Sequence, residues 1–355
     1  MIGLKILHTS DIHLREDSPE RLEALLKVLS IAAAEHIDLL IIAGDTFDDE
    51  ETADNLRPKL REIFSGNPFR ILIIPGNHDQ FAFNGDVHFG SDVTVALKTP
   101  CQTIDFKDAR IVAIPYAEKR IVDIARELEA SRVTDRQNIL IAHCTLDLLG
   151  MSKEGIGNEQ DCKYMPVSIE FLRSIGFDYV LAGHFHSSYK AYVVDNGKWF
   201  IYPGSPISIT EREQGRRAVN LLDTSLGHKE IPLDTPYFLT IQTEVRPGKE
   251  TETLKSLSAE LETHREGQGI IDVEIDGFIE KSENEFAKLV ESSLGTYNIR
   301  KISQTYRDIT KILDDPLYRM YSDELSRSQD LDGKLREEME KMALDSFIFL
   351  KARER

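Results

Sequence analysis

One pattern recurs through the first two thirds of the chain: a short apolar run ends abruptly in small and polar residues. The six runs cover residues 4–7, 39–43, 71–75, 139–142, 179–182 and 200–202. Continuous runs of this length that do not alternate are typical of strands buried on both faces, although periodicity alone does not exclude buried helix. The Gly and Pro residues that bound the runs favour strands.

Helix-like stretches lie between these runs. The clearest covers residues 19–35 and follows a Ser18-Pro19 start signal. Its apolar residues recur at helical spacing: Leu22, Leu25, Leu26, Leu29 and Ala33. Strands that alternate with helices predict a layered α/β domain, which we place over residues 1–232.

The pattern changes after residue 232. Residues 237–305 are expected to form a small second α/β domain in the order strand, helix, strand, helix, strand, at 237–244, 252–263, 270–275, 284–293 and 299–302. Residues 306–355 form a tail with helical periodicity, in which Leu331, Leu335, Met339, Met342 and Phe349 fall near one face. This face either packs on the protein itself or docks a coiled coil of a partner.

The charge balance is acidic, with 61 Asp and Glu against 43 Lys and Arg and a net charge of −18. Taken alone, this counts against nucleic acid as a partner, because binding to phosphates depends on Lys and Arg. Bound divalent metals would offset some carboxylates locally. Arg212, Arg216 and Arg217 are the best local candidates for contacts with a DNA backbone, and an ordinary charged loop is the alternative.

The sequence disfavours a membrane-spanning protein, a secreted protein and a disulfide-linked protein. Its longest apolar runs fall far short of the ~18–20 residues that a membrane span needs. Lys5, His8 and Asp11 interrupt the N-terminal region, so we expect no signal peptide, no membrane association and a cytoplasmic protein. Three cysteines (Cys101, Cys144 and Cys162) without CxxC spacing predict reduced thiols.

The residues that follow the predicted strands carry carboxylate, amide and imidazole side chains. In chain order these are Asp11 and His13, Asp45, Asn77 and His78, His143, and His184 and His186. Asp-x-His and His-x-His place both side chains on the same side of an extended segment, so that each pair can converge on one centre. Hard oxygen ligands with imidazoles suit Mn, Fe or Zn, and two such ions can hold a hydroxide in line with a phosphorus.

The blocks D-x-H, GD, GNHD, a single His and GHxH, in this order, resemble the calcineurin-like metallophosphoesterase superfamily. The resemblance implies a four-layer α-β-β-α sandwich with two divalent metal ions. One metal would be held by Asp11, His13, Asp45 and His186, and the second by Asp45, Asn77, His143 and His184, with Asp45 bridging. His78 corresponds to the catalytic histidine of that superfamily, which stabilises the phosphoryl oxygens or protonates the leaving oxygen.

Within the superfamily, KILHTSDIHL, GDTFD, IPY at 114–116 and YPGSP at 202–206 resemble the SbcD-type DNA repair nucleases, the bacterial form of the meiotic-recombination nuclease. This implies a double-strand exonuclease and single-strand endonuclease that uses manganese, with Mg, Fe or Zn as other options. It also implies that residues 237–305 form a capping domain and that the tail binds an SbcC-type SMC ATPase. A homodimer is expected, paired through helices at 53–64 and 81–95.

Asp48 marks a departure, because archaeal and eukaryotic relatives carry a further histidine at that place and bacterial proteins do not. We expect Asp48 either to contact a metal ligand or to belong to a solvated acidic loop at a helix N-terminus. Two other functions stay open: a small-molecule phosphodiesterase or phosphatase, and a scaffold that binds DNA ends for an SMC-type ATPase.

Overall fold

The computed structural model describes residues 3–83, 88–117, 120–147, 165–328 and 332–353, so Cys162 and Leu331 lie outside the described residues. Contacts divide the chain into two compact units. The first unit comprises Met1–Leu239 with Gly267–Gly269, and the second comprises Thr240–Glu266 with Ile270–Arg355. The boundaries expected at residues 232 and 305 between separately folding domains stay a prediction.

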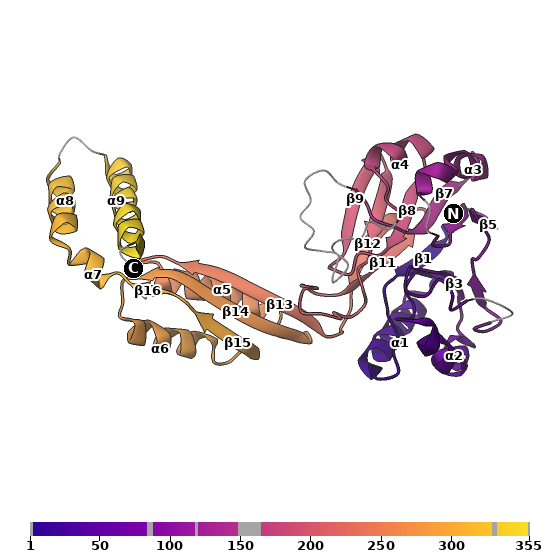
Figure 1. Ribbon diagram of the computed structural model, residues 1–355, viewed down its shortest axis with the longest axis horizontal. Coiled ribbons are helices and arrows are strands. Elements are labelled where there is room, and N and C mark those ends of the chain that lie inside the picture. Colours follow the sequence, from indigo (N-terminus) through magenta and orange to yellow (C-terminus); the bar gives the residue numbers. More distant parts are fainter. Residues whose placement is uncertain (1–2, 84–87, 118–119, 148–164, 329–331, 354–355) are drawn as a thin grey trace. The chain divides into compact units, whose positions relative to one another are not determined.

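Two six-stranded sheets form the centre of the first unit (Figure 1). The first sheet has the order β12-β11-β1-β2-β3-β4 and the second β5-β6-β7-β8-β10-β9. The strands of the first sheet are β1 (Lys5–Thr9), β2 (Leu39–Ala43), β3 (Arg70–Ile74), β4 (Val93–Val95), β11 (Ala218–Asp223) and β12 (Gly227–Pro232). Those of the second are β5 (Gln102–Asp105), β6 (Ala109–Ile114), β7 (Gln137–His143), β8 (Tyr179–Gly183), β9 (Lys190–Asp195) and β10 (Lys198–Tyr202).

Each apolar run is continuous because both faces of its strand are buried. Successive residues of a strand point to opposite faces. Ile6 and Ile41 therefore contribute to the core between the two sheets, whereas Leu7 and Leu40 contribute to the core on the outer face of the first sheet. The six expected strands correspond to β1, β2, β3, β7, β8 and β10.

Helices cover the outer face of each sheet. The longest of them are α1 (Pro19–Ala34) and α2 (Glu50–Phe64) on the first sheet, and the shorter α3 (Ala125–Ser131) and α4 (Ile169–Ile175) lie over the second (Figure 1). This arrangement confirms the expected four-layer α-β-β-α sandwich. The helix expected at residues 19–35 is present, although Leu26 is 45% exposed and Val28 takes its place in the buried stripe.

The parallel strands β1, β2 and β3 of the first sheet, and β6, β7 and β8 of the second, end at the same edge of their sheets. The two sheets pack face to face, so the loops after these strands meet. The side chains expected at the strand ends are therefore collected in one place.

The helix expected over residues 81–95 is wrong for the described part of that range. Residues 81–83 and 88–95 contain no helix, and β4 (Val93–Val95) pairs with β3 instead. Phe83 and Phe89 in this segment pack their rings against Phe47 at 5.8–5.9 Å between centroids. The helix expected over residues 53–64 lies within α2.

Residues 237–304, most of which belong to the second unit, follow the expected order of elements: β13 (Tyr237–Val245), α5 (Glu250–Glu262), β14 (Gly269–Ile279), α6 (Glu283–Leu294) and β15 (Ile299–Gln304). Its sheet has the order β13-β14-β15, with β16 (Arg307–Asp308) also paired with β14. Ser282 begins α6 with a capping box, in which its hydroxyl accepts from the Glu285 amide. Leu254, Leu257 and Phe286 bury the inner faces of the two helices.

The tail is helical and consists of α7 (Thr310–Leu313), α8 (Pro316–Arg327) and α9 (Gly333–Arg353). Helices α8 and α9 pack on each other, with the rings of Tyr318 and Phe347 in an edge-to-face contact at 5.3 Å. Leu317, Met320, Met342 and Phe349 nevertheless remain exposed. Among the helices of the described residues, none has the length and apolarity to cross a membrane.

His8 provides a test of the core between the sheets. It lies in β1 on the same face as Ile6 and is fully buried. Burial lowers its pKa from 6.5 to about 3, more than the Ala182 backbone raises it. Below pH 6.5 the His8 imidazole binds a proton in the unfolded chain but not in the folded chain. The free energy of unfolding should therefore fall by up to ~1.4 kcal/mol for each unit by which the pH is lowered.

We therefore expect urea titrations to show a stability gap between the wild type and a His8→Asn variant that narrows as the pH falls from 6.5 toward 3. The His88→Asn variant, which removes an exposed imidazole, is the matched control. A His8→Asn profile that runs parallel to that of the wild type would contradict a neutral buried imidazole.

Candidate metal centre

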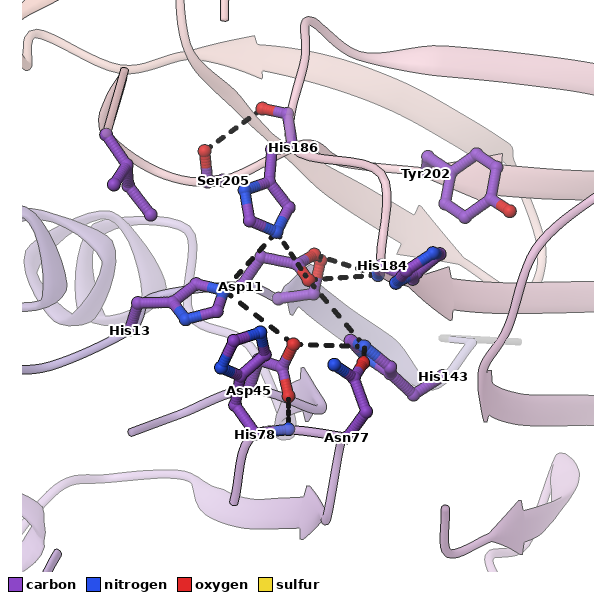
Figure 2. Close-up of polar contacts among 12 residues, drawn as sticks. Asp11, His13, Asp45, Asn77, His78, His143, His184, His186, Tyr202 and Ser205 are labelled. Carbon is purple, nitrogen blue, oxygen red and sulfur yellow. Dashed lines mark hydrogen bonds and ion pairs between the residues drawn. The ribbon is translucent and has the colours of Figure 1, made fainter. Parts of the chain in front are cut away.

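The eight residues predicted to form the site, seven metal ligands and His78, come together at the loop edge of the first unit (Figure 2). Asp11 and His13 follow β1, Asp45 follows β2, and Asn77 and His78 follow β3. His143 ends β7, and His184 and His186 follow β8. Strands from both sheets therefore supply the cluster.

The backbone at this edge is strained. Asp11, His13, Asp45 and His184 all have positive φ, at 54°, 48°, 50° and 97°. Residues other than Gly rarely adopt this region, and such strain persists only where the surrounding structure imposes it. These sharp turns direct the side chains of the loops toward one point.

Gly183 shows how closely the loops approach. A Cβ at this position would lie 2.0 Å from the Ala43 carbonyl oxygen and 2.8 Å from Nδ1 of His143. Only Gly leaves room for the loops after β2, β7 and β8 to touch.

The first group of candidate ligands is Asp11, His13, Asp45 and His186. One ligand atom from each lies within 4.8 Å of the others, and all four residues are buried. Nε2 of His13 is 3.3 Å from Nε2 of His186, and the latter is 3.7 Å from Oδ1 of Asp11. Two carboxylates and two imidazoles that converge in this way fit a divalent cation of the Mn, Fe or Zn type.

The second group of candidate ligands surrounds His143. Its Nε2 lies 3.0 Å from Oδ1 of Asn77 and 3.1 Å from Oδ2 of Asp45, while Nδ1 lies 2.9 Å from the Ala43 carbonyl oxygen. The His184 ring is 5.4 Å from that of His143. Because a carbonyl only accepts, Nδ1 of His143 carries a proton, which directs Nε2 to the site.

Asp45 connects the two groups. Its Oδ2 is 3.1 Å from His143 and 3.7 Å from His13, and its Oδ1 accepts from the amide of His78 at 3.0 Å. Burial raises the pKa of this carboxyl, but the charge and hydrogen bond of His143 outweigh it and hold the pKa well below the usual range. The same pair raises the pKa of His143 to about 10, against the opposing effect of burial. Asp45 thus remains an anion at the position that a bridging ligand would take.

His78 differs from the ligand candidates because its side chain is exposed. Its ring lies edge-to-face on that of His13 at 4.8 Å, and its Nδ1 is 3.3 Å from the backbone carbonyl oxygen of Asp48. This geometry places an imidazole at the open side of the cluster, where a substrate can reach it.

Asp48 contacts a ligand candidate. Its Oδ1 is 3.3 Å from Nδ1 of His13, and its Oδ2 accepts from Arg15 at 3.1 Å. The hydrogen bond to His13 lowers the pKa of Asp48 to about 2, although partial burial opposes the shift. Asp48 therefore stays charged and orients the His13 ring.

The expected phosphate contact of Arg217 is wrong. This side chain is 1% exposed, and its guanidinium donates to the carbonyl oxygens of His186 (2.7 Å), Gln214 (2.8 Å) and Gly215 (3.0 and 2.8 Å). The guanidinium is buried and donates to carbonyl oxygens inside the protein, so it does not face a DNA backbone outside. Arg212 and Arg216 are exposed, and their contact with DNA stays a prediction.

Two functional positions were missed by sequence reasoning. Glu213 is 1% exposed and its Oε1 lies 3.3 Å from Nδ1 of His186. Asp79 is the last residue of the GNHD block and accepts from the amides of Thr46 (2.7 Å), Phe47 (3.2 Å) and Gly76 (2.7 Å). The GNHD block itself signalled Asp79, whereas no motif pointed to Glu213.

Asp79 should be needed to hold the loop after β2 against the loop after β3. An Asp79→Asn variant turns an N–H donor toward at least one of three buried backbone donors, so we expect a loss of roughly 1–3 kcal/mol of unfolding free energy. Metal binding should weaken at the same time, since Asp45 lies in the displaced loop. Thermal unfolding and calorimetric metal titration measure both effects, with the exposed Asp135→Asn as control. Unchanged metal affinity in Asp79→Asn would contradict this role.

Comparisons with known proteins agree with this geometry. The calcineurin-like phosphoesterase family matches residues 4–188, slightly more than half of the chain. The DNA double-strand break repair protein Mre11 of Saccharolobus solfataricus is 25% identical over 354 residues, which cover 92% of this chain and 84% of that protein. The uncharacterized metallophosphoesterase YhaO of Bacillus subtilis is 25% identical over 258 residues, 64% of this chain and 59% of that protein.

Among solved structures, a dimetal phosphatase from Danio rerio superposes with a TM-score of 0.42 at 8% identity, over 65% of this chain and 99% of that one. The matched family region contains every candidate metal ligand, from Asp11 to His186. The chain therefore belongs to the calcineurin-like phosphoesterase family and is a metal-dependent phosphoesterase.

Proposed function

We propose that the protein cleaves phosphodiester bonds of DNA, as a manganese-dependent double-strand exonuclease and single-strand endonuclease of an SbcC/SbcD-type complex. The observation that carries the proposal is the buried set of carboxylates and imidazoles with the exposed His78 ring at its open side. The similarity to Mre11, which extends over 92% of this chain and so beyond the phosphoesterase region, supports DNA as the substrate.

Two bound divalent ions would supply an activated hydroxide and charge stabilisation on the phosphoryl oxygens. Asp11, His13, Asp45 and His186 would hold one ion, and Asp45, Asn77, His143 and His184 the other. The chain contributes the fixed positions of these side chains, which need no rearrangement during the reaction.

His78 would act on the oxygens of the phosphate. Its Nδ1 faces the Asp48 carbonyl oxygen, which only accepts, so Nδ1 carries a proton. In the imidazolium form Nε2 donates a hydrogen bond to a phosphoryl oxygen or a proton to the leaving deoxyribose oxygen. The neutral form can do neither from Nε2.

The small-molecule alternative uses the same centre on a different substrate. The family match covers residues 4–188 alone and YhaO is an uncharacterized metallophosphoesterase, so both fit this alternative equally. A second unit and a helical tail favour the larger substrate, since hydrolysis of a small phosphoester needs neither. The scaffold alternative predicts DNA binding without turnover.

The decisive experiment is hydrolysis by the purified protein with Mn, Mg or no metal. The substrates are end-labelled duplex, circular single-stranded DNA and bis-p-nitrophenyl phosphate. We expect manganese-dependent cleavage of all three substrates. The His78→Ala variant should lose activity roughly 10²–10⁴-fold, the usual contribution of a positioned general acid to the rate. The His88→Ala variant, which changes an exposed histidine outside the cluster, should keep full activity.

Hydrolysis of the synthetic diester without cleavage of either DNA, also after addition of an SMC-type ATPase, would reject the nuclease in favour of a small substrate. Binding of DNA ends without hydrolysis of any substrate would favour the scaffold. Full activity of His78→Ala would reject the role of His78.

For the partner, we propose that the exposed apolar side chains of α8 and α9 bind the coiled coil of an SbcC-type SMC ATPase. Met320 is 70% exposed and Met342 69%, which is unusual for large apolar residues. We expect Met320→Glu in α8 and Met342→Glu in α9 each to abolish co-purification with such an ATPase. Lys341→Glu, next to Met342 in α9, should retain co-purification. Retained binding in both methionine variants would contradict the proposal.

A homodimer is a further prediction. Light scattering after size-exclusion chromatography tests it, and a monomer would reject it.

A further inference from the structure

The chain segment 205–217 holds His186 from two sides, through its ring and through its backbone carbonyl. From these contacts we infer that Glu213 is a positioning residue of the metal centre: it fixes the His186 imidazole in the one tautomer and orientation that direct Nε2 to the metal. The inference rests on the metal-dependent phosphoesterase site and is independent of the DNA substrate.

The first step concerns the carboxylate itself. Glu213 is buried, yet its two oxygens face several donors. Oε2 accepts from the Ile209 amide at 2.7 Å, and Oε1 accepts from the Thr210 hydroxyl at 3.4 Å. These contacts fix the carboxylate plane, so that the remaining direction of Oε1 points to Nδ1 of His186 at 3.3 Å.

The second step concerns the imidazole. A carboxylate surrounded by donors accepts, so the proton of a neutral His186 ring sits on Nδ1. Nε2 then keeps its lone pair, and it is this atom that lies 3.3 Å from Nε2 of His13 and 3.7 Å from Asp11. Carboxylate contacts of this kind orient metal-binding histidines and raise their basicity as ligands.

The third step concerns the backbone. The carbonyl oxygen of His186 accepts from Arg217 Nη1 at 2.7 Å, from the Ser205 amide at 3.2 Å and from the Ser205 hydroxyl at 3.0 Å. Figure 2 shows the Ser205 hydroxyl directed at this carbonyl. A ring held at Nδ1 on a backbone held at its carbonyl has little freedom to swing away from the centre.

The fourth step concerns the segment as a whole. Ser208 and Gly215 donate backbone hydrogen bonds to the carbonyl oxygens of Pro236 and Phe238, at 3.2 and 2.8 Å. Gly204 directly precedes the segment, and a Cβ on it would lie 1.9 Å from the Ser187 carbonyl oxygen, so the start of the segment lies close against the loop that carries His186. Glu213 is therefore presented from a fixed support.

The test compares Glu213→Gln, His186→Ala and the double variant by calorimetric titration of the metal-free proteins with MnCl₂. Glu213→Gln keeps the shape but turns an N–H donor toward either His186 or Ile209. We expect it to weaken manganese binding roughly 10–100-fold, the usual effect of removing such a contact. Glu211→Gln, an exposed carboxylate two residues away, should bind as the wild type does.

The double variant separates positioning from a general structural role. If Glu213 acts through His186, adding Glu213→Gln to His186→Ala should change manganese affinity little. Additive losses in the double variant, or an unchanged affinity in Glu213→Gln with only a lower thermal midpoint, would overturn the inference.

A measurement on the wild type guards against a variant that does not fold. In the zinc-loaded protein with ¹⁵N-labelled histidine rings, we expect the His186 signals of a proton on Nδ1 and a metal on Nε2. A ring that binds zinc through Nδ1 would overturn the inference. Both readouts concern metal binding, so a failure of DNA cleavage leaves this test intact.

Discussion

The rest of the structure depends on the burial of two carboxylates and four imidazoles in one small volume. Groups of this kind are costly to remove from water unless each has a partner or a metal ion. Asp11 accepts from the His184 amide, Asp45 accepts from the His78 amide, and His143 faces the Ala43 carbonyl. Each partner is a backbone group at or just after the end of another strand, so the same contacts that compensate burial also fix the relative positions of the strand ends.

The two-sheet sandwich is what makes such loops available. Parallel strands end at one edge, and packing of two sheets brings both edges together. The energy for this comes from the apolar core between the sheets, to which Ile6, Ile41 and Leu181 contribute. Four of the ligand candidates, Asp11, His13, Asp45 and His184, occupy strained backbone at positive φ. Core burial thus sustains a local geometry that would not persist in an isolated loop.

A second ring of carboxylates supports the ligand candidates without belonging to them. Asp48 contacts His13, Asp79 ties the loops after β2 and β3 together, and Glu213 contacts His186. Asp48 and Glu213 thus contact different ligand candidates, whereas Asp79 contacts the backbone of the loops that carry them. The stiffness of the centre is therefore distributed over several contacts, of which the one from Glu213 lies well outside the strand-end blocks.

The sequence by itself determined the six buried strands, the helix after β1, the order of elements in the second unit and the eight strand-end residues, because each depends on short-range periodicity or on neighbours within a few positions. It did not reveal β9 or β12, whose residues are partly polar and exposed and which become strands only by pairing with β10 and β11. Only the tertiary structure decided that Arg217 is buried and that Glu213, 27 positions after its partner, meets His186. Long-range hydrogen bonds of this kind leave no local pattern, since the chain that separates the partners is free to vary until the fold brings them together.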